Sequence, residues 1–353
     1  MAAADVDVLA AAMLRMPSWI AGLGLVVAGL AGCGSEDDRS RPETFQGIDL
    51  LFVINDSRAM GPLQLRLGEH VADFLDALAA AEGSLPSVHV GVISTEVEDA
   101  TTPGVLCPGT AGGELRPAAC LAGGAFARSE DGNYAGTLAD AAACMIMVGD
   151  QGCPFEQPLE AMRRALDGSV PGNEGFLRDE ALLAVVFLTD EDDCSSADPS
   201  LYSQGATRYG PLSSYRCFSQ GVRCDQPDPT RPGPRTGCVP ATDGPLHPVA
   251  DYLAFLEARK GGRERVIVGG LVPPVSPVAV QVEASTGQLL LQPLCAEISP
   301  EEGLQSWPSP RMHALAEAIS PTGAEPALGS LCSSDWSIPL AALAQRIADT
   351  YRD

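Results

Sequence analysis

Two groups of oxygen-bearing side chains stand out in the chain, and each directly follows a nearly unbroken apolar run. The first, Asn-Asp-Ser at 55–57, follows the run 48–54. The second is a series of four acids, 190–193, which follows the run 181–189. Carboxylate, amide and hydroxyl oxygens are the ligands that Mg²⁺ and Ca²⁺ prefer. Four acids at the end of a buried strand are costly to enclose without cations or hydrogen-bond donors, so we expect them to be solvated or bound.

The elements expected to position these groups are strands of a parallel sheet. Mostly apolar runs are typical of strands buried on both faces, and four are present: 48–54, 88–93, 181–189 and 265–271. Segments with apolar residues at helical spacing alternate with them: 61–82, 137–147, the segment after the turn 151–157, 248–259, 311–319 and 337–351. This alternation predicts a doubly wound, mostly parallel α/β sheet. Since parallel strands end at one edge, both polar groups should meet there.

Other segments lack this alternation. Residues 101–133 are rich in Gly, Pro and Ala and predict a long loop, whereas 278–282 and 289–291 predict a hairpin. Residues from about 195 to 247 are rich in Pro, Gly, Ser and Asp, with three cysteines and little periodicity. We interpret them as a Cys-rich insertion in a domain spanning 47–350.

The N-terminus has the pattern of an export signal. A short apolar stretch, 19–31, follows Arg15 and ends in Leu-Ala-Gly-Cys at 30–33, which resembles a bacterial lipobox. The resemblance implies that the signal peptide 1–32 is removed and that the thiol of Cys33 is acylated. Residues 33–46 are then a lipidated flexible tether.

The residue after the lipidated cysteine bears on location. Gly34 stands there instead of Asp, and in lipoproteins of this type that favours the outer membrane. We therefore expect an outer-membrane lipoprotein that faces the periplasm or the cell surface and is held by its N-terminal lipid.

The cysteines fit an exported protein with disulfide bonds. The chain has 11 cysteines, so an even number remains if Cys33 carries lipid. Local pairing would join Cys107 to Cys120, Cys144 to Cys153 and Cys295 to Cys332, although spacing leaves all pairings open. No pair has Cys-x-x-Cys spacing and the 4 histidines are scattered, which argues against zinc. The cysteines available for disulfides are Cys107, Cys120, Cys144, Cys153, Cys194, Cys217, Cys224, Cys238, Cys295 and Cys332.

The net charge of the chain and the catalytic motifs that its sequence lacks both argue against certain classes of function. The net charge is −24, and such a surface repels nucleic acid and anionic headgroups, so no nucleic-acid partner is expected. The sequence contains no His-Glu-x-x-His, Gly-x-Ser-x-Gly or phosphate-binding glycine loop. An enzyme is therefore disfavoured, and an uncharacterised hydrolase is the least favoured reading.

Phe-Val-Ile-Asn-Asp-Ser-Arg-Ala-Met at 52–60, together with Leu-Thr-Asp at 188–190, resembles a von Willebrand factor type A domain. More narrowly, Gly-Cys-Pro-Phe-Glu-Gln at 152–157 and Thr-Asp-Glu-Asp-Asp-Cys-Ser at 189–195 resemble bacterial lipoproteins that carry this domain. The resemblance covers roughly 46–350, with the insertion outside the core. It implies a Rossmann-like, doubly wound sheet. It also implies a metal-ion-dependent adhesion site built from Asp-x-Ser-x-Ser, a Thr on a second loop and an Asp on a third.

The match to that site is partial. Asn55 stands in place of the first Asp, Ser57 is retained, and Ala59 replaces the second Ser. Asp190 fits the acid of the third loop, whereas the second-loop Thr has no counterpart. Arg58 brings a positive charge nearby, which disfavours a divalent cation. The resemblance therefore implies a degenerate site at Asn55, Ser57 and Asp190, with at most weak Mg²⁺ or Ca²⁺ binding.

Three functions follow from these observations. The first is a membrane-anchored extracytoplasmic binding or adhesion module, which contacts a protein partner without a fully functional metal site. The second is a Mg²⁺- or Ca²⁺-dependent adhesion module that uses Ser57, Asp56, Asp190 and Asp192. The third is the hydrolase. In the first two, the partner is a protein in the periplasm or on the cell surface.

Overall fold

A computed structural model of the chain describes residues 45–83, 85–97, 112–116, 119–213, 215–226, 228–295 and 305–352. The predicted signal peptide, Cys33 and the tether up to residue 44 lie outside these ranges. No helix within them combines the length and hydrophobicity that a membrane crossing requires.

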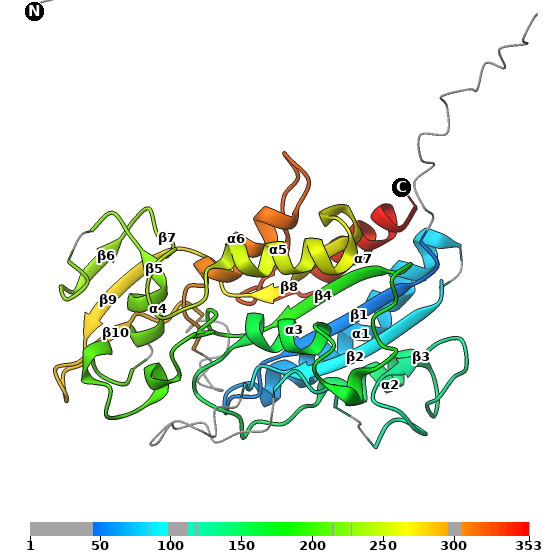
Figure 1. The fold of residues 1–353 in the computed structure, drawn as a ribbon, viewed down its shortest axis with the longest axis horizontal. Coiled ribbons are helices and arrows are strands. Elements are labelled where there is room, and N and C mark those ends of the chain that lie inside the picture. Colours follow the sequence, from blue (N-terminus) through cyan, green and yellow to red (C-terminus); the bar gives the residue numbers. More distant parts are fainter. Residues whose placement is uncertain are drawn as a thin grey trace, which may run out of the picture. The chain divides into compact units, whose positions relative to one another are not determined.

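A six-stranded sheet forms the centre of the fold (Figure 1). Its strand order is β11-β8-β4-β1-β2-β3, and all neighbours are parallel except β2 and β3. Every residue of the four longest strands is buried, which explains their mostly apolar sequences. The sequence therefore predicted the central strands correctly and missed the two short edge strands. The strands are β1 (Ile48–Ile54), β2 (Val88–Ser94), β3 (Ala127–Arg128), β4 (Leu182–Leu188), β8 (Val266–Val272) and β11 (Ala327–Ser330).

Helices cover both faces of this sheet, as the doubly wound prediction requires. Alternate residues of β1 point to opposite faces, so Leu50 and Phe52 join one core and Leu51 and Val53 the other. The first core is closed by α1 (Gly61–Glu82), α2 (Leu138–Ile146) and α7 (Ser337–Arg352). The second is closed by α3 (Pro158–Leu166), α5 (Val249–Lys260) and α6 (Pro310–Ile319).

The insertion folds into short elements of its own, beyond the ends toward which β4 and β8 run (Figure 1). The predicted hairpin is confirmed, and a strand of the insertion, β6, pairs with its first strand to make a three-stranded sheet. The elements are η2 (Pro199–Tyr202), η3 (Thr207–Tyr209), α4 (Tyr215–Gly221), β5 (Val222–Arg223), β6 (Gly233–Arg235) and β7 (Val239–Pro240), with the hairpin β9 (Val278–Val282) and β10 (Leu289–Leu291). Two further short helices are η1 (Pro171–Asn173) and η4 (Arg263–Arg265).

Disulfides hold the loops and the insertion. The predicted bond between Cys295 and Cys332 is confirmed. The two other local pairings are wrong, because Cys120 bonds to Cys144 and leaves neither for the predicted partner. Packing decides this pairing, since α2, which carries Cys144, lies against β3 near the loop that carries Cys120. Cys153 also lies in a disulfide, and Cys107 lies outside the described residues.

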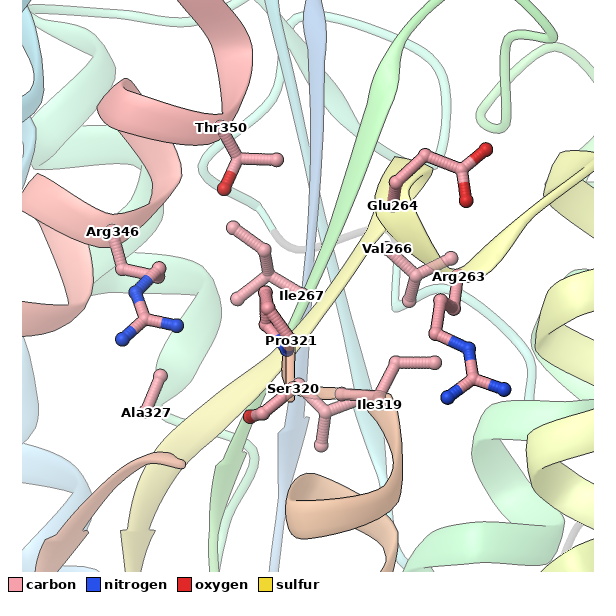
Figure 2. Close-up of a pocket in the computed structure, with 11 residues that line it drawn as sticks. Arg263, Glu264, Val266, Ile267, Ile319, Ser320, Pro321, Ala327, Arg346 and Thr350 are labelled. Atoms are coloured by element: carbon pink, nitrogen blue, oxygen red, sulfur yellow. The ribbon is translucent and has the colours of Figure 1, made fainter. Parts of the chain in front are cut away.

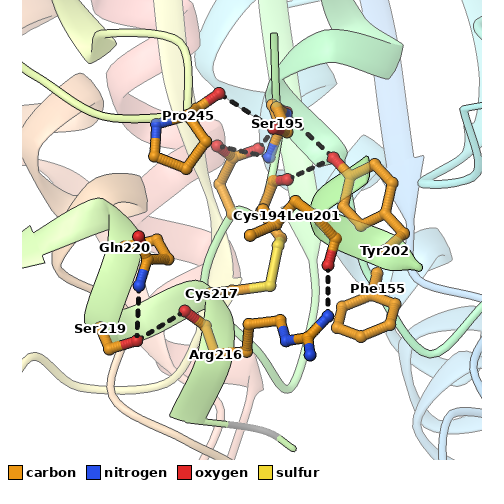
Figure 3. Close-up of a disulfide and its surroundings, with 12 residues drawn as sticks. Phe155, Cys194, Ser195, Leu201, Tyr202, Arg216, Cys217, Ser219, Gln220 and Pro245 are labelled. Atoms are coloured by element: carbon orange, nitrogen blue, oxygen red, sulfur yellow. Dashed lines mark hydrogen bonds between the residues drawn. A yellow bond between two sulfur atoms is a disulfide. The ribbon is translucent and has the colours of Figure 1, made fainter. Parts of the chain in front are cut away.

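Two disulfides belong to the insertion. One joins Cys194, just after β4, to Cys217 on α4 (Figure 3). The other joins Cys224 to Cys238 across the base of β5 and β7. These bonds restrict a segment with few long helices or strands.

Candidate functional site

The two polar groups predicted to converge do meet at the carboxyl edge of the sheet. β1 and β4 are paired in register up to Ile54 and Leu188, so Asn55 and Thr189 leave the sheet side by side. The Asn55 side-chain amide donates to the Asp190 carboxylate, with Nδ2 and Oδ1 2.8 Å apart. It also lies 3.3 Å from the Thr189 hydroxyl. Asn55 and Thr189 are fully buried, and the exposed fraction of Asp190 is 2%.

The loop after β1 is held in a defined shape. Asn55 Oδ1 accepts the backbone N–H of Ser57 at 2.7 Å, a short Asx turn that leads into α1. The Gln64 side chain donates to the Asn55 carbonyl at 2.9 Å and to the Gly149 carbonyl at 2.7 Å. Ser57 is half-buried and Ala59 is exposed, so this loop presents one hydroxyl where the adhesion-site pattern has two.

A glutamate that the sequence analysis did not assign completes the site. Glu156 lies in the loop before α3, and its exposed fraction is 1%. Its Oε2 accepts the hydroxyl of Thr95 at 2.5 Å, whereas its Oε1 is buried without a hydrogen-bond partner among the described residues. Glu156 belongs to the motif 152–157 that carried part of the resemblance, so the sequence marked this segment. The residues that Glu156 contacts could not be predicted from the sequence.

An arginine from a separate loop supplies the positive charge. Arg116 Nη2 lies 3.0 Å from Asp56 Oδ2 and 2.7 Å from the Ser94 hydroxyl, and Nη1 donates to the Val148 carbonyl at 3.2 Å. Asp56 Oδ1 is buried without a partner among the described residues. Arg58, which the sequence suggested as the nearby cation, is exposed instead. Arg116 thus ties together three loops at this edge.

The last two acids of the series 190–193 serve the fold. Asp192 accepts the backbone N–H groups of Arg311 and Met312 at the start of α6, at 3.1 and 3.2 Å. Asp193 pairs with the guanidinium of Arg311 at 2.8 Å and accepts the N–H of Leu159 at 3.1 Å. The structure therefore directs Asp192 and Asp193 toward the helix starts and only Asp190 toward Asn55.

Burial dominates the electrostatics of the cluster. It raises the pKa of Asp190 to about 7 and, with help from the charge of Glu96, raises the pKa of Asp56 to about 6. The pKa of Glu156 lies well above its usual value because of burial and the nearby charge of Glu191. Asp56 and Asp190 therefore take up protons at a higher pH than exposed aspartates do.

The resemblance implies a divalent cation at this edge, which would need several oxygen ligands. Asn55 directs an NH₂ group toward Asp190, and that group cannot ligate a cation. Ala59 contributes no oxygen. Within the described ranges, no group of three or more His, Cys, Asp or Glu side chains is arranged to hold a metal ion. The loop after β1 does not fit an adhesion-type cation.

The insertion packs directly against this edge. The rings of Phe155 and Tyr202 lie 5.4 Å apart, so the residue before Glu156 contacts the insertion (Figure 3). Tyr202 in turn donates its hydroxyl to the Cys194 carbonyl at 2.7 Å. From the other side, the backbone N–H of Trp307 donates to the Asp190 carbonyl at 2.9 Å. The acids are thus enclosed by the insertion and its neighbours.

The chain was also compared with known proteins. No family model matches it, and no curated protein matches it.

Proposed function

We propose that the chain is an outer-membrane lipoprotein, acylated at Cys33, whose von Willebrand factor type A-like domain binds a protein partner without a divalent cation. The lipobox at 30–33 and the polar tether support the anchor. The mostly parallel α/β sheet, with its polar groups gathered at the carboxyl edge, supports the domain assignment.

One observation carries the cation-independent part of the proposal, namely the buried hydrogen bond of 2.8 Å from Asn55 to Asp190. An adhesion-type cation needs open oxygens and a free position for a partner's carboxylate. Here the side-chain amide of Asn55 already donates to the carboxylate of Asp190, and Asp190 is buried. A partner would then bind the exposed side chains around the carboxyl edge of the sheet.

Exposed side chains at that end fit protein contact. Arg58 and Ala59 are exposed in the loop after β1, and Leu65 in the first turns of α1 is 56% exposed. On the insertion, Val239 is also 56% exposed. Arg is enriched in protein interfaces, and the buried core of an interface is more apolar than the rest of the surface.

Site-specific photo-crosslinking in cell envelopes tests the proposal. A photoreactive amino acid would replace Arg58, Val239 or, as a control at the opposite edge of the sheet, the exposed Glu264. We expect adducts of one common mass from Arg58 and Val239, none from Glu264, and the same yield in Mg²⁺ and in EDTA. Equal adducts from all three positions would contradict a specific interface.

A Mg²⁺- or Ca²⁺-dependent module is the second candidate, and one observation favours it. Asp56 Oδ1 and Glu156 Oε1 are both buried without partners among the described residues, which is costly for a carboxylate. Loss of the Arg58 and Val239 adducts in EDTA would favour this candidate over the first.

A further inference from the structure

A cavity lies at the amino-terminal edge of the sheet, opposite the candidate site (Figure 2). It exists because β11 is short. β11 pairs with β8 only from Gly269 to Val272, which leaves the first three residues of β8 without a neighbouring strand on that side within the described residues. About 620 Å³ of space, part of it open to solvent, remains between β8 and the ends of α6 and α7.

The floor of this cavity is apolar. Val266 and Ile267 of β8 and Ile319 at the end of α6 line it, and each is at least nine-tenths buried. Pro321 and Ala327 extend the apolar wall (Figure 2). An apolar concave surface with few polar groups is the usual form of a small-molecule site.

Guanidinium groups stand at its rim. Arg346 of α7 and Arg263 flank the cavity from two sides, and the Glu264 carboxylate is turned away from both (Figure 2). Arg263 is already paired with Glu257 at 2.9 Å. Arg346 donates to the Glu325 carbonyl at 3.3 Å and has no carboxylate partner among the described residues. One guanidinium charge at the rim is therefore uncompensated.

The neighbouring sequence is basic in an otherwise acidic chain. Arg259, Lys260, Arg263 and Arg265 lie within seven residues that include one acid, although the net charge of the chain is −24. Lys260 donates to the backbone carbonyls of Arg178 and Asp179. Arg259 lies 3.7 Å from Asp179 and Arg263 is paired with Glu257, so among the described residues that line the cavity Arg346 is the guanidinium that can take an anion.

We infer that this cavity binds an aliphatic carboxylate. The alkyl chain lies on Val266, Ile267 and Ile319, where its burial removes apolar surface from water. The carboxylate faces Arg346, whose planar guanidinium can donate two parallel hydrogen bonds. This inference does not depend on the partner or the cation content of the opposite edge.

The test uses octanoate as the probe and the full chain carrying Cys33→Ser, with isoleucine methyl groups isotope-labelled for NMR. Titration should shift the methyl signals of Ile267 and Ile319 saturably. Octanamide, which has the same chain without the charge, should bind at least fivefold more weakly. Arg346→Gln should weaken octanoate binding at least fivefold and leave octanamide unchanged.

Two further variants complete the design. Thr350→Phe fills the cavity from the last turns of α7 and should abolish the shifts, whereas Arg352→Gln removes a guanidinium from the same helix outside the cavity and should leave them intact. Circular dichroism checks that each variant is folded. Equal binding of octanoate and octanamide, or no shift at Ile267 and Ile319 in the parent protein, would overturn the inference.

Discussion

Replacing Asn55 by Asp is the sharpest perturbation of the carboxyl edge. The change is nearly isosteric, but it exchanges a buried NH₂ donor for a carboxylate oxygen 2.8 Å from Asp190 Oδ1. It also restores the acid that the adhesion-site pattern has at this position. The variant therefore distinguishes two roles of Asp190, namely acceptor of a hydrogen bond from Asn55 and ligand of a cation.

The expected loss of stability follows from burial. A hydrogen bond to a charged group is worth about 1.5–3 kcal/mol, and an uncompensated buried charge costs about 3–5 kcal/mol. Asn55 is fully buried and Asp190 is 2% exposed, so solvent screens this pair little. Because one of the two carboxyls can retain a proton, we expect a loss of unfolding free energy at the lower end of the second range, about 3 kcal/mol at pH 8.

Urea unfolding at pH 8 in EDTA, followed by circular dichroism, measures this loss. Gln345→Glu is a matched control, because the Gln345 amide also donates to a carboxylate at 2.8 Å, that of Asp349, but on an exposed face of α7. That control should lose less than about 1 kcal/mol. If Asn55→Asp were as stable as the parent protein in EDTA, the argument from the buried hydrogen bond would be refuted.

Two further predictions follow from contacts in the structure, and a third follows from the sequence. Burial raises the pKa of Asp190 to about 7 and that of Asp56 to about 6, so the folded state binds protons more tightly than the unfolded state. Their contribution to stability is full below about pH 4 and is lost as the pH rises through 6 to 7; urea unfolding should therefore show a free energy of unfolding lower by at least about 2 kcal/mol at pH 8 than at pH 5. Arg311→Met leaves the carboxylate of Asp193 buried and unpaired, and should lower the free energy of unfolding by about 3–5 kcal/mol; a loss below about 1 kcal/mol would contradict the pairing. Cys33→Ser should move the protein from the membrane to the soluble fraction on centrifugation, and continued sedimentation with membranes would contradict the lipobox interpretation.

The central sheet was predictable because its strands carry a strong local signal. β4 is a seven-residue apolar run, and β1 has one polar residue, Asp49, among its seven. Such runs have few alternatives to a buried strand. β3 has two residues and β11 has four, Ala-Leu-Gly-Ser, so neither shows a pattern of its own. These edge strands form because the finished sheet offers them a partner.

The candidate site was predictable only where it depends on strand direction. Asn55 and Asp190 meet because parallel strands end at one edge. Arg116 and Glu156 reach the same edge from loops without periodicity, and their partners follow from tertiary packing alone. The pairing of Cys120 with Cys144 has the same cause, since packing of α2 outweighs nearness along the chain.

Calorimetric titration of Mg²⁺, Mn²⁺ and Ca²⁺ into the oxidised full chain carrying Cys33→Ser, beside the same chain with Asp190→Ala, tests the central claim most directly. If the hydrogen bond from Asn55 to Asp190 takes the place of a cation, neither protein should show saturable heat with any of the three ions. Saturable binding by the parent protein that disappears with Asp190→Ala would contradict the account and assign a working cation site to this edge.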